Sequence, residues 1–322
     1  MKRMTVIAIV LSFCVTVLPF GAAAADTLVP GGKVVGLNLG DDSMVIAGFD
    51  SILGAAAQKA GLQIGDKIVN INGRAVHCTE DISNALDANK ENAEVRYIRY
   101  GKMKSTKVQP IQTEDGPRLG IYLKQGISGV GTVTWYNPAN GTFGALGHGV
   151  NGGNGQPVPV SKGTIYRATI LSIIKGRAGE PGQLVGSLRD KTPIGIIEKN
   201  VQQGIFGTIN AHWQGKALPV ADNDEIRTGG AVIRSNVSGE EVREYSVESL
   251  KIYPSSKDGG RNMLIKVTDP ALLEATGGIV QGMSGSPIIQ NGKLVGAVTH
   301  VLVNDPTRGY GIFIENMLDA AA

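Results

Sequence analysis

The chain has 322 residues, 42% of them apolar and 18% charged, a composition that fits a protein with a hydrophobic core and excludes disorder over most of its length. Its 45 glycines are about twice the usual share, and with 5% aromatic residues they favour a mostly β protein with many tight turns. The net charge of +3 falls further without Lys2 and Arg3, and no basic stripe is present, so we expect no nucleic-acid partner.

The N-terminus predicts export. Lys2 and Arg3 precede the almost wholly apolar run 5–20, and the alanines at 22–24 form a small-residue cleavage signal. The run is short for a membrane span, but an uncleaved anchor stays open as an alternative. We therefore expect residues 1–25 to be a signal peptide or a membrane anchor, with the rest of the chain acting outside the cytoplasm.

Cysteine, metal and cofactor chemistry are not expected. Cys14 falls in the leader and Cys78 is the only other cysteine, so no intramolecular disulfide is expected. His77 adjoins Cys78, but adjacent side chains generally point apart, and no His pair or Cys cluster has metal-ligand spacing. Residues 147–152 match G-x-G-x-x-G, yet the glycines and proline of 153–157 exclude the helix that a dinucleotide loop requires.

Residues 57–73 carry the run A-x-x-A-G-L-x-x-G-D-x-I-x-x-I-N-G, in which a short helix, a Gly-Asp turn and an alternating strand follow one another. This run resembles a PDZ domain, which we expect over residues 26–112. Such domains bind an extended peptide by adding it to a sheet edge beside a helix. The resemblance implies that the backbone N–H groups of Val35, Gly36 and Leu37 receive a peptide terminus. A groove occupied by the protein's own chain is the alternative.

Residues 113–322 alternate short apolar strands with glycine turns, and one short helix is expected at 270–275. The spacing and composition predict a β-barrel or sandwich. Residues 282–287, Gly-Met-Ser-Gly-Ser-Pro, resemble the nucleophile loop of chymotrypsin-like serine peptidases. Glycine lets the backbone bend so that the N–H groups of Gly282 and Ser284 form an oxyanion hole while the serine hydroxyl stands free.

Ser284 needs a base, and His148, flanked by glycines far upstream, is the expected one. Neutral imidazole can accept the hydroxyl proton at neutral pH because its pKa lies near 6.5. His77 lies in the PDZ region, His212 beside a tryptophan favours a surface or packing role, and His300 lies in an apolar strand where a satisfied core histidine is expected.

The order of leader, PDZ run, Gly-His-Gly and Gly-Met-Ser-Gly-Ser-Pro resembles the stage IV sporulation protein B (SpoIVB) family of serine peptidases, and residues 297–311 are similar to that family as well. The resemblance implies a small α+β PDZ domain followed by a chymotrypsin-like double β-barrel over 113–322. It implies a serine endopeptidase without a cofactor, with Ser284 as nucleophile and His148 as base.

The resemblance also implies Asp269 as the acid that orients His148. Asp269 directly before Pro270 equally fits a helix N-cap followed by proline at the first helical position. Asp222 and Asp224 are the reserve candidates for the acid.

The resemblance finally implies a role in signalling. Such proteins are exported from the forespore into the space between the two membranes of a developing endospore. They cleave themselves near the N-terminus and cut the extracytoplasmic part of a membrane-bound regulator, which releases an intramembrane metalloprotease and activates a late sigma factor. The alternatives are a non-catalytic exported PDZ adaptor and a housekeeping protease of the HtrA type, whose PDZ modules follow the protease domain.

Overall fold

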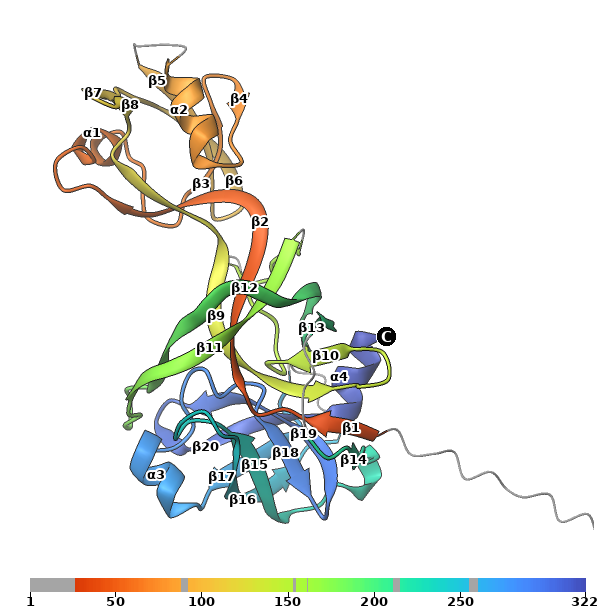
Figure 1. Ribbon diagram of the computed structural model, residues 1–322. Helices are drawn as coiled ribbons and strands as arrows, with labels where there is room; N and C mark the ends of the chain where they lie inside the picture. The colour runs from red at the N-terminus through yellow and green to blue at the C-terminus, as the bar shows by residue number, and fades with distance from the viewer. Residues whose placement is uncertain (1–26, 88–91, 153–154, 161, 211–214, 255–259) are drawn as a thin grey trace, which may run out of the picture.

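The structure is a computed structural model, and it describes residues 27–322 except 88–91, 153–154, 161, 211–214 and 255–259. The predicted leader and His212 therefore lie outside the described residues. The chain is mostly β, with two barrels and a smaller unit that extends from the first barrel (Figure 1). Within the described part, no helix is long and apolar enough to cross a membrane.

Six antiparallel strands form the first barrel. They are β2 (Val34–Phe49), β9 (Ile121–Tyr136), β10 (Thr142–Ala145), β11 (Lys162–Ile174), β12 (Gln183–Val201) and β13 (Gly204–Ile209). The ladder runs β9-β10-β13-β12-β11-β2 and closes because β2 also pairs with β9. Leu37, Val133 and Ile165 belong to its buried core. Two short strands, β1 (Thr27–Pro30) and β14 (Leu218–Pro219), extend the ladder beyond β9.

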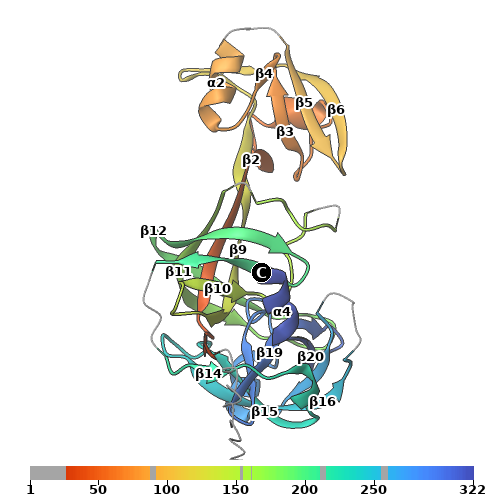
Figure 2. The same ribbon diagram turned by 90° about the vertical axis from the view of Figure 1, so that its right-hand side faces the viewer.

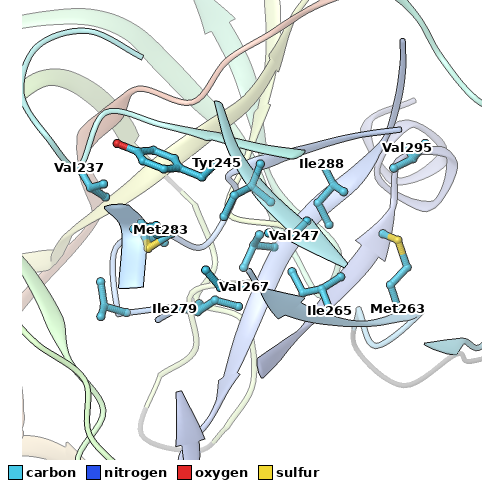
Figure 3. Packing of buried hydrophobic residues seen from close by; sticks show 14 of the residues in the cluster. Val237, Tyr245, Val247, Met263, Ile265, Val267, Ile279, Met283, Ile288 and Val295 are labelled. Carbon is cyan, nitrogen blue, oxygen red and sulfur yellow. The ribbon is translucent and has the colours of Figure 1, made fainter. Parts of the chain in front are cut away.

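The second barrel is built from the C-terminal third of the chain. Its strands are β15 (Gly229–Ser235), β16 (Arg243–Ile252), β17 (Met263–Val267), β18 (Pro287–Gln290), β19 (Lys293–Leu302) and β20 (Asp305–Phe313). Period-two alternation turns Val247, Ile265 and Ile288 towards the core that Figure 3 shows.

Three short helical elements accompany the second barrel: η1 (Asn223–Glu225), α3 (Pro270–Thr276) and α4 (Ile314–Ala321). The predicted helix at 270–275 is therefore confirmed as α3. Ile314 and Met317 of α4 pack with Trp135 and Phe206 of the first barrel, so the last helix joins the two barrels.

The smaller unit has the PDZ arrangement that residues 57–73 predicted. Its elements are α1 (Ala55–Lys59), β3 (Lys67–Ile71), β4 (Arg74–Ala75), α2 (Thr79–Asp87), β5 (Ala93–Arg99), β6 (Lys102–Val108), β7 (Ile111–Thr113) and β8 (Gly116–Arg118). The Gly-Asp pair of the motif has a structural reason. Asp66 is buried, accepts a hydrogen bond from the Gln63 amide and forms an ion pair with Arg99, 2.6 Å from its Nε, which ties the turn to β5.

The PDZ unit is an insertion in the first barrel. Both β2 and β9 continue from the barrel into the unit as one antiparallel ribbon, with Leu39 opposite Ile127 in the barrel part and Met44 opposite Gln125 nearer the unit (Figures 1 and 2). The PDZ unit therefore does not have the expected bounds of 26 and 112. Its core runs from Met44 to Leu123, and β1 and the first half of β2 belong to the barrel.

This arrangement corrects the predicted peptide-binding loop. Val35, Gly36 and Leu37 lie in β2, where the strand is paired on both edges: Gly36 lies opposite Val130 of β9 and Tyr166 of β11. Their amides belong to the barrel wall and cannot receive a peptide terminus at the PDZ unit. Beside α2, the chain's own strand β8 packs against the helix. The alternative of a groove occupied by the protein's own chain fits this arrangement.

The insertion predicts which deletion the barrel tolerates. Removing residues 41–125 joins Gly40 to Gly126 and leaves the Leu39–Ile127 pair closed by a two-residue Gly-Gly loop, which suits a hairpin turn. We expect this variant to unfold in one cooperative thermal transition with near-UV circular dichroism retained. A variant lacking residues 31–112 loses the whole of β2, a strand of the barrel wall, and should show neither property. Equal folding of the two variants would contradict the insertion.

Candidate active site

Ser284 stands in a loop between α3 and β18 whose shape depends on two glycines. Gly282 and Gly285 have φ of 98° and 94°, in the region that favours glycine. At Gly285 a Cβ would lie 2.0 Å from the carbonyl oxygen of Thr132 and 2.5 Å from the amide of Leu146, so only glycine lets this loop approach the first barrel. Within the described part of the chain, the amides of Gly282 and Ser284 have no hydrogen-bond acceptor.

Thr132 of β9 holds the serine loop against the first barrel. Its amide donates to the carbonyl of Ser284 at 2.9 Å, and its Oγ1 donates to the carbonyl of Gly282 at 2.8 Å. Its own carbonyl accepts from the amide of Leu146 at 3.2 Å. Thr132 is fully buried, so water does not compete for these hydrogen bonds. One residue thereby links the serine loop to the segment that carries His148.

His148 follows β10 in a tight, glycine-dependent segment. Leu146 and Gly147 both have positive φ, 68° and 66°, which is unusual for a leucine and marks backbone strain. A Cβ at Gly147 would lie 2.9 Å from Cγ2 of Thr299, so this turn packs directly against the second barrel. Asn200 of β12 clamps the next residues, because its side chain bonds both the amide and the carbonyl of Val150.

The imidazole of His148 has a defined tautomer. Its Nδ1 lies 2.9 Å from the carbonyl oxygen of Gly149. Because a carbonyl only accepts, Nδ1 carries the proton, and Nε2 keeps the lone pair that a general base needs. Burial lowers the pKa of His148 below its usual 6.5, which keeps the ring neutral.

His300 of β19 is a second histidine at the site. Its ring centroid lies 5.2 Å from that of His148, and its Nδ1 is buried without a partner. Burial lowers the pKa of His300 to about 4, and the electrostatic interactions with His148 and with the positively charged Arg261 act in the same direction. The expectation of a satisfied core histidine is therefore corrected: His300 is half-buried, has an unpaired nitrogen and packs on the predicted base.

Ser284 and His148 line one cavity of about 340 Å³, with Gly282 beside them. Its other walls come from β2, β9, the segment after β10 and Gln281. The hydroxyl of Ser284 donates to the carbonyl of Thr299 at 2.8 Å, and no hydrogen bond joins it to His148 in the described structure. The fold therefore brings together the predicted nucleophile, base and oxyanion amides, although they come from distant parts of the chain.

Asp269 has a different place from the one that the resemblance implied. It is the N-cap of α3: its Oδ1 accepts from the amides of Ala271 and Leu272, and its Oδ2 accepts from the amide of Ser246. It does not line the cavity of Ser284, and the Nδ1 proton of His148 goes to Gly149 instead. The geometry supports the cap interpretation.

The reserve acids do not replace Asp269. Asp222 and Asp224 are exposed at η1, where the Asp222 amide donates to the side chain of Glu225, and neither lines the cavity. Among the described residues, the place of a triad acid beside Nδ1 of His148 is thus taken by the backbone carbonyl of Gly149.

The sequence did not predict the roles of Thr132 and Asn200, because a polar residue within an apolar strand does not reveal contacts to distant segments.

A serine and a histidine at the junction of two six-stranded barrels, with free amides beside the serine, define a chymotrypsin-like serine peptidase fold. Residues 115–318 match the SpoIVB peptidase S55 family, and residues 51–99 match a PDZ domain. The chain belongs to the SpoIVB peptidase S55 family. The structure adds β1 and the first half of β2 to the segment that the family match covers.

The chain is also similar to proteins of other kinds. It is 46% identical over 59 residues to "Putative zinc metalloprotease SA1105" of Staphylococcus aureus (strain N315), a match that covers 18% of this chain and 14% of that protein. The chain thus spans about a seventh of the length of the curated relatives that it matches.

Two solved structures with low similarity also match. The active form of the Rv3671c protease from M. tuberculosis has a TM-score of 0.37 and 15% identity, covering 61% of this chain and 73% of that one. The HtrA-type protease AlgW with decapeptide has a TM-score of 0.37 and 14% identity, covering 65% of this chain and 57% of that one.

The role of Asp269 can be tested with two substitutions. Asp269→Ala should lower the free energy of unfolding by about 1 kcal/mol, because it removes an N-cap, whereas Asp269→Asn keeps a capping oxygen and should stay close to wild type. Denaturant titration measures both. The rate at which a fluorophosphonate labels Ser284 should be unchanged in Asp269→Asn. A fall of about 10⁴-fold, as expected for loss of a triad acid, would contradict the cap assignment.

The two neighbouring histidines predict a pH-dependent stability. In the unfolded chain they protonate near pH 6.5, whereas in the folded protein His300 stays neutral down to about pH 4. The unfolded state therefore binds more protons in this range, and the free energy of unfolding decreases as the pH falls from 6.5 towards 4. His300→Leu should make the Tm fall less steeply over this range in calorimetry, since carboxylates titrate equally in both proteins. If the Tm of wild type and of His300→Leu changed with pH in parallel, His300 would be excluded as a source of the pH-dependent stability.

Proposed function

We propose that the chain is a serine endopeptidase in which Ser284 attacks the peptide carbonyl and His148 is the general base. The observation that carries the proposal is that Ser284, His148 and the amide-bearing Gly282 line one cavity although they come from two different barrels. Membership of the S55 family supports the same assignment.

The reaction follows from the groups at hand. A rotation of the Ser284 side chain exchanges the carbonyl of Thr299 for Nε2 of His148 as acceptor of the hydroxyl proton. As this proton moves to His148, the serine oxygen bonds to the substrate carbonyl carbon, and the amides of Gly282 and Ser284 stabilise the oxyanion. The imidazolium then protonates the leaving amine as the peptide bond breaks. Water hydrolyses the acyl-enzyme with His148 again accepting a proton and returning it to Ser284.

The surroundings of His148 predict slow turnover. The Gly149 carbonyl holds the correct tautomer but brings only a partial negative charge, and the fixed charge acting on the neighbouring His300, that of Arg261, is positive. The imidazolium that forms in the transition state is therefore stabilised less than beside a carboxylate. A slow protease suits a signalling role better than bulk degradation.

The finer role that we propose is that of an exported protease of sporulation. It acts in the space between the forespore membranes, cleaves itself near the N-terminus and cuts the extracytoplasmic part of a membrane-bound regulator, which releases an intramembrane metalloprotease and activates a late sigma factor. Family membership supports this role, and the PDZ unit fits a protein or peptide partner. In this proposal the N-terminal leader directs the export of the chain and, where it is not cleaved, anchors it in a membrane.

Fluorophosphonate labelling tests the catalytic assignment. Wild type should be labelled and Ser284→Ala should not, because the reactive hydroxyl is gone; mass spectrometry of the labelled peptide gives the site. Ser286→Ala is the matched control: this serine lies two residues away, is fully buried and has an unpartnered hydroxyl, so labelling should persist. Absence of label from wild type would favour the non-catalytic PDZ adaptor.

A further inference from the structure

The cavity of Ser284 and His148 adjoins a second cavity. The first has a volume of about 340 Å³ and the second about 590 Å³, and both are lined by Leu37, Gly129 and Val130. The second cavity lies between this part of β2 and β9 and the first residues of β12, 183–188. We refer to these two adjoining cavities together as the groove, and the first of them contains the nucleophile.

The walls of this groove are mostly aliphatic. Leu39, Leu146 and Val150 line the first cavity, and Val185 and Leu188 line the second. Neither set of described lining residues includes an aspartate, glutamate, lysine or arginine. A charged side chain placed here would lose its hydration without gaining a counter-charge, whereas an aliphatic one gains by burial.

Gly129 leaves open the space where the two cavities meet. A Cβ at this position would have no heavy atom within 4 Å, although the residue lies in a paired strand opposite Leu37. Its φ is not in the left-handed region, so the backbone does not require glycine here. The missing side chain therefore serves the cavity and not the fold.

We propose that the groove binds an extended polypeptide with an aliphatic side chain beside the scissile bond, and that Gly129 is the specificity-determining position. This inference rests on the proposed function, because the groove starts at Ser284. The peptide side chain occupies the space above Gly129.

Binding to the uncleaving Ser284→Ala full chain tests the proposal without requiring catalysis. The probes are fluorescein-labelled Gly/Ser decapeptides with one central Leu, Val, Ala, Asp or Lys, measured by fluorescence anisotropy. We expect the Leu and Val peptides to bind at least ten-fold more tightly than the Asp and Lys peptides. Adding Gly129→Val should weaken the Leu peptide about ten-fold and affect the Ala peptide less, because valine fills the shared space.

Gly230→Val is the matched control, since Gly230 also lies in a strand, a Cβ there would have no heavy atom within 4 Å, and it lines neither cavity. It should leave all affinities unchanged. Equal affinities for the whole series, tighter binding of charged peptides, or equal effects of Gly129→Val and Gly230→Val would overturn the proposal. The two proposals can fail separately. If the peptides bind as expected but fluorophosphonate does not label the wild-type protein, the groove proposal stands and the catalytic function is overturned.

Discussion

The geometry of the site depends on the hydrogen bonds of Thr132. Its amide, hydroxyl and carbonyl are all used, two of them on the loop of Ser284 and one on the segment before His148. Gly285 and Gly147 let these two segments approach the opposite barrel to distances that no Cβ allows. A buried threonine between two glycine-shaped loops therefore sets the relative position of nucleophile and base, which neither barrel could do alone.

Two strands connect the site to the PDZ unit. β9 carries Thr132 and Gly129 at the site and enters the PDZ core at its other end. β2 likewise has Leu37 at the site and ends at Phe49 in the PDZ unit. The PDZ unit is thus held by two continuous strands of the barrel wall and not by a loop. The two strands that enter the PDZ unit are therefore the same strands that line the cavity of Ser284 and His148.

Much of this architecture was predictable from local sequence. The PDZ run at 57–73, the glycine loop around Ser284 and the capped helix after Asp269 are patterns whose physics lies within a few residues. The insertion was not predictable, because β2 reads as two short strands and nothing local shows that it pairs with both β9 and β11. Val35, Gly36 and Leu37 were misplaced for that reason. Long-range partners such as Asn200 leave no local signal.

The replacement of an acid by a carbonyl separates two roles that a triad carboxylate combines. One role fixes the tautomer of the histidine. The Gly149 carbonyl can do this because it only accepts hydrogen bonds, so the Nδ1 that faces it must carry the proton. The other role stabilises the imidazolium, and a neutral carbonyl does this weakly, while protonated His300 or Arg261 would oppose it. A site built in this way keeps the base in the correct tautomer, but it stabilises the imidazolium weakly, and Ser284 must still turn from the carbonyl of Thr299 to His148. We therefore expect the rate to depend both on the charge around His148 and on the rotation of Ser284.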